Sequence, residues 1–255
     1  MQRLRAFRPT SWNPFRACSG LWIILTPSVV ASELFHFAGE VWRAVEAQHK
    51  VSTMRLVDND LQQQALLESL IETGKPPLAA GTEGLHWLLA APFRYSPPPG
   101  GSRFRAALDT GVFYGALQRR TACAECGYWR WRFVQDSAGL SRMDAHPMSL
   151  FDAKVQSPAL DLRASPYDAQ RLQWTDPVNY AATQAIGQEA RQAGAGAILY
   201  ESVRDPERGG CAAVLSPGAF VPGQEPLAET WYLSVTANGA VWQRDRATAF
   251  SFRWA

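Results

Sequence analysis

The side chains best suited to chemistry lie in residues 101–125, GSRFRAALDTGVFYGALQRRTACAE. Arg103, Tyr114 and Glu125 follow one another there at intervals of eleven residues. Guanidinium groups match phosphate oxygens because their planar donors can bind in pairs. A tyrosine ring can pack on an aromatic group, and a fixed carboxylate can stabilise positive charge on a sugar during glycosidic cleavage. The segment therefore predicts a site for a phosphorylated, aromatic molecule.

A serine in a second segment, YESVRDP, is a further candidate. Ser202 follows the apolar run AILY and begins a loop, where functional hydroxyls commonly lie. It can orient Glu125 or a ribose hydroxyl by a hydrogen bond, or it can only cap its own turn. A structural interpretation also stays open for the first segment. Its arginines suit a protein surface, Tyr114 suits the core, and Glu125 suits a solvated helix face.

The cysteines and histidines predict no metal site. The single Cys123-x-x-Cys126 motif lacks the second pair that a structural zinc site requires. A redox dithiol stays open, but buried reduced thiols are favoured because the cysteines are too few and too unevenly placed for a disulfide framework. The histidines stand in no arrangement typical of a base or a ligand set. The remaining cysteines and the histidines are Cys18, Cys211, His36, His49, His86 and His146.

Composition favours a compact protein with a sizeable core. Of the 255 residues, 47% are apolar and 19% charged, and the formal net charge is only +2. Beyond the N-terminus no basic stripe typical of a nucleic-acid groove occurs. Residues 1–34 resemble a signal peptide, with four arginines before LWIILTPSVVA, but the apolar run is short and contains a proline. We instead predict a basic leader, partly disordered or a short helix, on a cytoplasmic protein that has no membrane span.

The pattern of elements predicts one α+β domain over residues 35–255, with a mixed sheet and flanking helices. A helix with one apolar face is expected after Asp58 and is expected to end at Gly74. A second is expected to begin at Asp176-Pro177 and to end at Gly194. The apolar face consists of Leu61, Leu66, Leu67, Leu70 and Ile71. A short helix is expected over 85–91, strands over 39–49, 92–96, 111–116, 148–155, 197–202 and 211–216, and a hairpin at 238–239.

Several of these blocks, in this order, resemble the RES domain family. They are VWRAVEAQH, FRYSPPPGGSRF, GVFYGA with TACAE, DPVNYAATQAIGQEAR and ILYESVRDPERGG. The resemblance runs from about Val41 to the final hairpin, and LWIILTPSVVASE is similar to the family's opening stretch. It implies a fold similar to ADP-ribosyltransferases. It also implies a toxin of a toxin–antitoxin module that consumes NAD⁺ and is silenced by an antitoxin with a helix-turn-helix (Xre-like) region.

The resemblance also implies roles for individual residues. The family's named Arg, Glu and Ser fall on Arg103, Glu125 and Ser202, the expected catalytic set, and Tyr114 belongs to the same NAD⁺ site. The acceptor stays open: inorganic phosphate as co-substrate, water, or a protein in an ADP-ribosyl transfer. A catalytically inactive module that binds NAD⁺ or a partner is a further alternative.

One earlier site arginine is ambiguous. The resemblance places it on Arg43 of VWRAV, whereas the long insertion between residues 50 and 92 makes Arg94, with its neighbour Tyr95, a rival for NAD⁺ binding. The chain also departs from the family pattern because Cys123 and Cys126 flank Glu125, where small apolar residues are commoner.

Overall fold

The computed structural model describes residues 26–47, 57–58, 60–97 and 99–254. Most of the predicted leader, together with Cys18 and His49, lies outside the described residues. Within the leader's last part, helix α1 (Pro27–Ser32) begins after Thr26, whose hydroxyl caps it, and has a proline in its first turn. The domain boundary at residue 35 stays a prediction.

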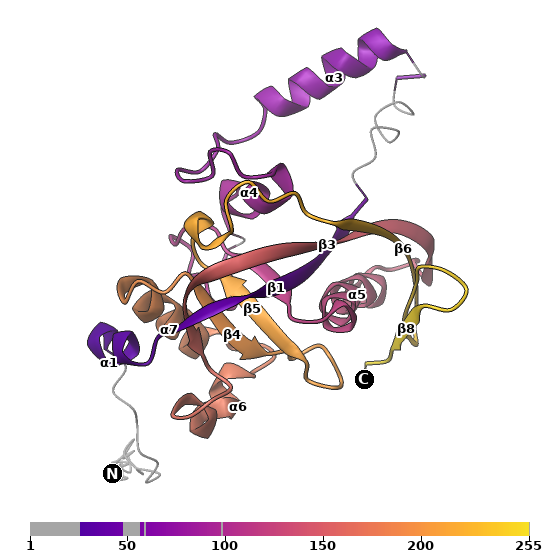
Figure 1. Cartoon of the computed structure of the whole chain (residues 1–255). Helices are drawn as coiled ribbons and strands as arrows, with labels where there is room; N and C mark the ends of the chain where they lie inside the picture. The colour runs from indigo at the N-terminus through magenta and orange to yellow at the C-terminus, as the bar shows by residue number, and fades with distance from the viewer. Residues whose placement is uncertain (1–25, 48–56, 59, 98, 255) are drawn as a thin grey trace, which may run out of the picture.

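An eight-stranded mixed sheet forms the centre of the molecule (Figure 1). The strand order is β1-β2-β5-β4-β3-β6-β7-β8, and an additional pairing of β1 with β3 closes β1, β2, β5, β4 and β3 into a ring. The β3–β4 pair is parallel and the others are antiparallel. The strands are β1 (Phe35–Glu46), β2 (Phe113–Ala116), β3 (Arg142–Asp161), β4 (Ala197–Glu201), β5 (Gly210–Val214), β6 (Ala228–Thr236), β7 (Gly239–Gln243) and β8 (Ala249–Phe252).

Helices flank this sheet, so the predicted α+β class is confirmed. They are α3 (Leu61–Thr73), α4 (Trp87–Arg94), α5 (Arg119–Asp136), α6 (Arg171–Trp174) and α7 (Ala181–Gln192), with the 3₁₀ helices η1 (Tyr167–Gln170) and η2 (Pro217–Ala219). In the part of the chain that the structure describes, no helix has the length and apolar character needed to cross a bilayer.

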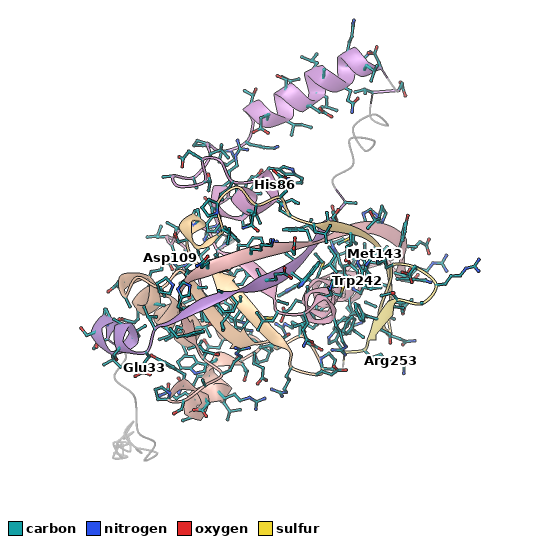
Figure 2. The ribbon with its side chains drawn as sticks, viewed as in Figure 1. Glu33, His86, Asp109, Met143, Trp242 and Arg253 are labelled. Atoms are coloured by element: carbon teal, nitrogen blue, oxygen red, sulfur yellow. The ribbon has the colours of Figure 1, made fainter. Side chains whose placement is uncertain are left out.

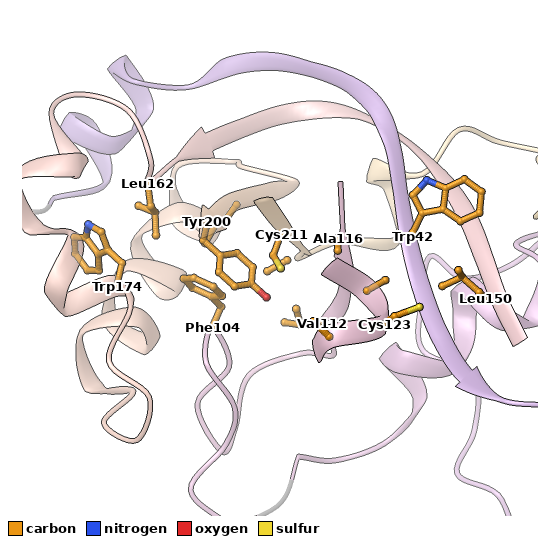
Figure 3. Close-up of a cluster of buried hydrophobic side chains, with 14 of the residues drawn as sticks. Trp42, Phe104, Val112, Ala116, Cys123, Leu150, Leu162, Trp174, Tyr200 and Cys211 are labelled. Atoms are coloured by element: carbon orange, nitrogen blue, oxygen red, sulfur yellow. The ribbon is translucent and has the colours of Figure 1, made fainter. Parts of the chain in front are cut away.

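Two hydrophobic clusters lie on the two faces of the sheet because strand side chains alternate. On β4, Ile198 and Tyr200 belong to one cluster, and Leu199 belongs to the other. The first cluster is covered by α5 and α7 and contains Phe104 and Tyr200, whose rings pack edge to face (Figure 3). The second is covered by α4 and η2. The first face is the one that carries the candidate site.

Helix α3 differs from the prediction in its cap and in its surroundings. Asp60, not Asp58, caps it by accepting from the backbone N–H groups of Gln62 and Gln63 at 2.8 and 3.1 Å. Asp58 has a φ of 49° and lies in a turn before the cap. The apolar face does not join the core: Leu61 and Leu66 are 71% and 61% exposed. The helix extends away from the sheet (Figures 1 and 2), so the apolar periodicity of this segment does not reflect burial.

Three further local predictions are corrected. The strand expected over 92–96 is wrong, because Phe93 packs with Leu89 one turn earlier on α4, which ends at Arg94. Helix α7 begins later than expected, because Asp176 accepts from the N–H groups of Val178 and Asn179 and so caps a separate turn. Strand β8 was not predicted. The strands at 39–46, 113–116, 197–201 and 210–214 and the hairpin at 238–239 are confirmed.

Candidate active site

Helix α5 brings Glu125 to the wall of a cavity of about 670 Å³. The residues before it, Thr121, Ala122, Cys123 and Ala124, are small and buried, so the helix lies close against the sheet. The cavity is bounded by α5, by β1 and β2, and by the turn at 101–103. Helix α5 and strand β2 therefore bring Glu125 and Tyr114 to the same cavity.

Ser202 contacts Glu125 directly. Its Oγ donates to Glu125 Oε1 at 2.6 Å and accepts from the backbone N–H groups of Arg204 and Asp205 at 3.2 and 2.9 Å. The side chain is fully buried. Both roles weighed for this serine are thus present together: it caps its own turn, and the same hydroxyl fixes the orientation of the Glu125 carboxylate.

The pKa of Glu125 is raised above its ordinary value, chiefly because burial disfavours the charged form. The hydrogen bond from Ser202 and the charges of Arg103 and Arg204 act in the opposite direction and lower the pKa. The carboxylate is therefore held in a weakly solvated position and depends on its neighbours for ionisation.

The turn before β2 aims Arg103 into the cavity. Gly101 has a φ of +79°, and a Cβ there would lie 2.1 Å from the carbonyl oxygen of Arg105, so the turn needs glycine. Arg103 Nη1 donates to the carbonyl of Trp174 at 3.0 Å, and its guanidinium lies 4.7 Å from the ring centroid of Tyr180. Arg105 points away from this cavity and donates to the carbonyls of Asp109 and Tyr95.

Tyr114 holds this turn in place. Its hydroxyl is hydrogen-bonded to Ser102 Oγ at 2.9 Å and accepts from the backbone N–H of Phe104 at 3.0 Å. Burial raises the pKa of the phenol. The ring lines the cavity, so Tyr114 connects β2 to the two residues on either side of Arg103.

Arg43 reaches the same cavity from β1. Its Nη1 donates to the carbonyl of Tyr114 at 2.9 Å, and its guanidinium lies 5.0 Å from the ring centroid of Phe113. Burial lowers the pKa of the guanidinium. Gly115 permits this approach of the strands, because a Cβ there would lie 3.2 Å from the Trp42 carbonyl.

The cavity wall carries three guanidinium groups that form no ion pair within the described residues: those of Arg43, Arg103 and Arg204. Arg204 donates to the carbonyl of Pro177 at 2.7 Å and lies 4.1 Å from the ring centroid of Tyr128. All three side chains are half-buried, and guanidinium groups that form no ion pair can donate to a negatively charged ligand. The cavity is therefore suited to an anionic ligand with more than one charge.

Arg94 and Tyr95 are not brought together with Glu125. Both border a second cavity of about 400 Å³, on the side of α4. Arg94 is paired with Glu72 at 2.8 Å and also donates to the carbonyl of Pro76. Of the two rival arginines, only Arg43 lines the cavity that contains Glu125.

Several cavity residues were not in the predicted site. Arg204 was identifiable only as one of the basic residues after Ser202, whereas Tyr180, Tyr200 and Trp129 carry no local signal that separates them from core aromatics. Cys126 also lines the cavity, and burial raises its pKa to about 11. Cys123, Cys126 and Cys211 are free thiols, and no group of three or more metal-binding side chains occurs among the described residues.

The fold and this cavity define a class: an α+β domain with a buried carboxylate facing several guanidinium groups. A family model, described as RES domain, matches residues 77–236, and the chain belongs to this family. Arg103, Tyr114, Glu125 and Ser202 lie within the match, and Arg43 precedes it. No curated protein matches the chain in a sequence comparison.

Among solved structures, the chain is similar to one described as the crystal structure of the M. tuberculosis MbcT-MbcA toxin-antitoxin complex. The sequence identity is 11%, the TM-score is 0.45, and the likeness covers 89% of this chain and 91% of that chain.

Proposed function

We propose that this protein consumes NAD⁺ by cleaving the bond between nicotinamide and ribose, as the toxin of a toxin–antitoxin module. The observation that carries the proposal is the Glu125 carboxylate, hydrogen-bonded to Ser202 at 2.6 Å in a cavity with three guanidinium groups that have no acidic partner among the described residues. Membership of the RES domain family supports the same activity.

The charges of the cavity suit this substrate. The diphosphate of NAD⁺ would lie against Arg43, Arg103 and Arg204, which form no ion pair among the described residues. The nicotinamide riboside end would lie beside Glu125. An aromatic ring of the substrate would pack on the cavity's aromatic side chains, which include Tyr114 and, 4.7 Å from the Arg103 guanidinium, Tyr180.

The chemical step needs no redox partner. The bond between ribose C1′ and the pyridinium nitrogen breaks, and its electron pair returns to the ring, which leaves as neutral nicotinamide. Positive charge develops on the ribose, and the Glu125 carboxylate stabilises it electrostatically. Phosphate or water then forms the new bond to C1′ and gives up a proton to solvent.

The experiment that tests this function compares Glu125→Gln with the wild-type protein. Glutamine keeps the shape and removes the charge, so we expect release of nicotinamide from NAD⁺ to fall by about 10² or more. Glu225→Gln is the matched control, because Glu225 is 87% exposed and does not line the cavity. Near wild-type turnover by Glu125→Gln would contradict the assignment.

The acceptor is decided by the products, since the residues named here bind the donor. Wild-type protein is incubated with NAD⁺ in the presence and absence of inorganic phosphate. We expect ADP-ribose 1″-phosphate as the product when phosphate is present, and free ADP-ribose when phosphate is absent. ADP-ribose attached to protein, with neither small product, would instead identify a transferase. Binding of NAD⁺ without turnover under all conditions would identify an inactive module.

The toxin role makes a separate prediction. Production of the wild-type chain in a bacterial host should stop growth and lower cellular NAD⁺, and Glu125→Gln should do neither. We further propose that the partner antitoxin, a helix-turn-helix protein, acts by covering this cavity. A complex in which NAD⁺ is still consumed at full rate would overturn that mode of inhibition.

A further inference from the structure

One face of helix α5 continues past Glu125 toward the surface as a row of cavity-lining residues. Trp129 and Phe133 follow Glu125 at i+4 and i+8, the spacing of one helix face, and both line the same cavity, as does the neighbouring Cys126. Trp129 and Phe133 are 57% and 55% exposed, whereas Glu125 is only partly exposed and lies at the inner end. Two exposed aromatic side chains one helical turn apart, both lining one cavity, are suited to contact with a ring of a ligand.

The distances along this row are set by helix geometry. At a rise of about 1.5 Å per residue, Trp129 lies roughly 6 Å and Phe133 roughly 12 Å along the axis from Glu125. The carboxylate and the aromatic pair are thus the two ends of one elongated site.

The guanidinium group of Arg204 lies near both Glu125 and Trp129. The backbone N–H of Arg204 donates to Ser202 Oγ, which in turn binds Glu125. The guanidinium of the same residue lies 5.4 Å from the ring centroid of Trp129. Trp254 fixes this loop, because its indole N–H donates to the carbonyl of Arg204 at 2.7 Å. The order along the cavity is therefore carboxylate, guanidinium, exposed aromatic pair.

We infer that Trp129 and Phe133 form the subsite for the second base of the dinucleotide, the adenine that is distant from the bond to be cleaved. The inference rests on the proposed function, because it assumes that the reacting ribose lies beside Glu125. A dinucleotide has the same order of parts: a scissile bond, a diphosphate and a terminal purine. Purine bases bind to exposed aromatic side chains by stacking.

The test measures binding without turnover. ADP-ribose, which carries the adenine but no scissile bond to nicotinamide, and ribose 5-phosphate, which has no base, are titrated calorimetrically into wild type, Trp129→Ala and Phe133→Ala. The control is Trp87→Ala, because Trp87 is 53% exposed and does not line this cavity. We expect Trp129→Ala to weaken ADP-ribose binding by about 10-fold and to leave ribose 5-phosphate unchanged.

The kinetic counterpart is a rise in KM for NAD⁺ with little change in kcat for Trp129→Ala, whereas Glu125→Gln changes kcat. If Trp129→Ala and Phe133→Ala both bind ADP-ribose as tightly as wild type, the base subsite is overturned and the proposed function stands. The base subsite is equally overturned if these variants lose only affinity for a protein partner. If the wild-type protein binds neither ADP-ribose nor NAD⁺, the proposed function itself fails.

Discussion

Two cavities formed by the described residues border on arginine and tyrosine side chains, and Arg94 in one differs from Arg43 and Arg103 in the other. In the smaller cavity, Arg94 is paired with Glu72, and Arg105 donates to two backbone carbonyls. In the larger one, Arg43 and Arg103 have only carbonyl and ring partners among the described residues, and they share the wall with Glu125. Residue type alone therefore does not mark a site. An unneutralised cation beside a fixed carboxylate does.

The strongest contrast is expected between Arg103→Ala and Arg94→Ala. Charge-assisted hydrogen bonds to a phosphate contribute roughly 1.5–3 kcal/mol, so Arg103→Ala should lower kcat/KM for NAD⁺ by roughly 10- to 100-fold. Arg94→Ala should leave kcat/KM within about twofold and affect only the contact between α4 and α3. Steady-state assays of nicotinamide release decide this. Equal losses in the two variants would remove the distinction between the cavities.

Ser202→Ala probes the larger cavity at its carboxylate. The variant loses the hydrogen bond to Glu125, and we expect turnover to fall by roughly fivefold, less than in Glu125→Gln. It also leaves the N–H groups of Arg204 and Asp205 without their side-chain acceptor. Thermal unfolding should therefore show a loss of about 1–3 kcal/mol with the fold retained. An unchanged rate would leave this serine with its turn-capping role alone.

The pH dependence gives a smaller but more specific effect. Catalysis needs ionised Glu125, and burial raises its pKa, so the acidic limb of kcat should lie above pH 4.5, the ordinary value. The Ser202 hydrogen bond lowers this pKa, and its loss in Ser202→Ala should move the limb further toward neutral pH. A pH–rate profile from about pH 4 to 8 measures both. A shift of the acidic limb of Ser202→Ala to lower pH than in the wild-type protein would contradict this mechanism.

The sequence predicted those parts of the site that depend on local pattern. The strand with Tyr114, the helix with Glu125 and the strand end with Ser202 follow from apolar runs and turn residues that act over short range. The family resemblance then predicted that Tyr114, Glu125 and Ser202 belong to one site. The choice between Arg43 and Arg94 needed the tertiary structure, because β1 reaches β2 through a long-range pairing that no local signal encodes.

What the sequence did not predict depends on contacts between elements that are distant in the chain. The apolar face of α3 has the right period for a core helix, but periodicity does not say whether another element covers it. Trp129 and Tyr200 likewise have the composition of core residues, and only the fold shows that they border a cavity. Local patterns thus define elements, whereas burial and accessibility are set by how the elements assemble.

The most direct test of the central claim is a crystal structure of Glu125→Gln with NAD⁺, since this variant should bind the substrate without consuming it. We predict NAD⁺ in the cavity of about 670 Å³, with ribose C1′ beside residue 125 and the diphosphate in contact with Arg43, Arg103 or Arg204. NAD⁺ bound instead in the cavity bordered by Arg94 and Tyr95, or with its diphosphate beside residue 125, would contradict it.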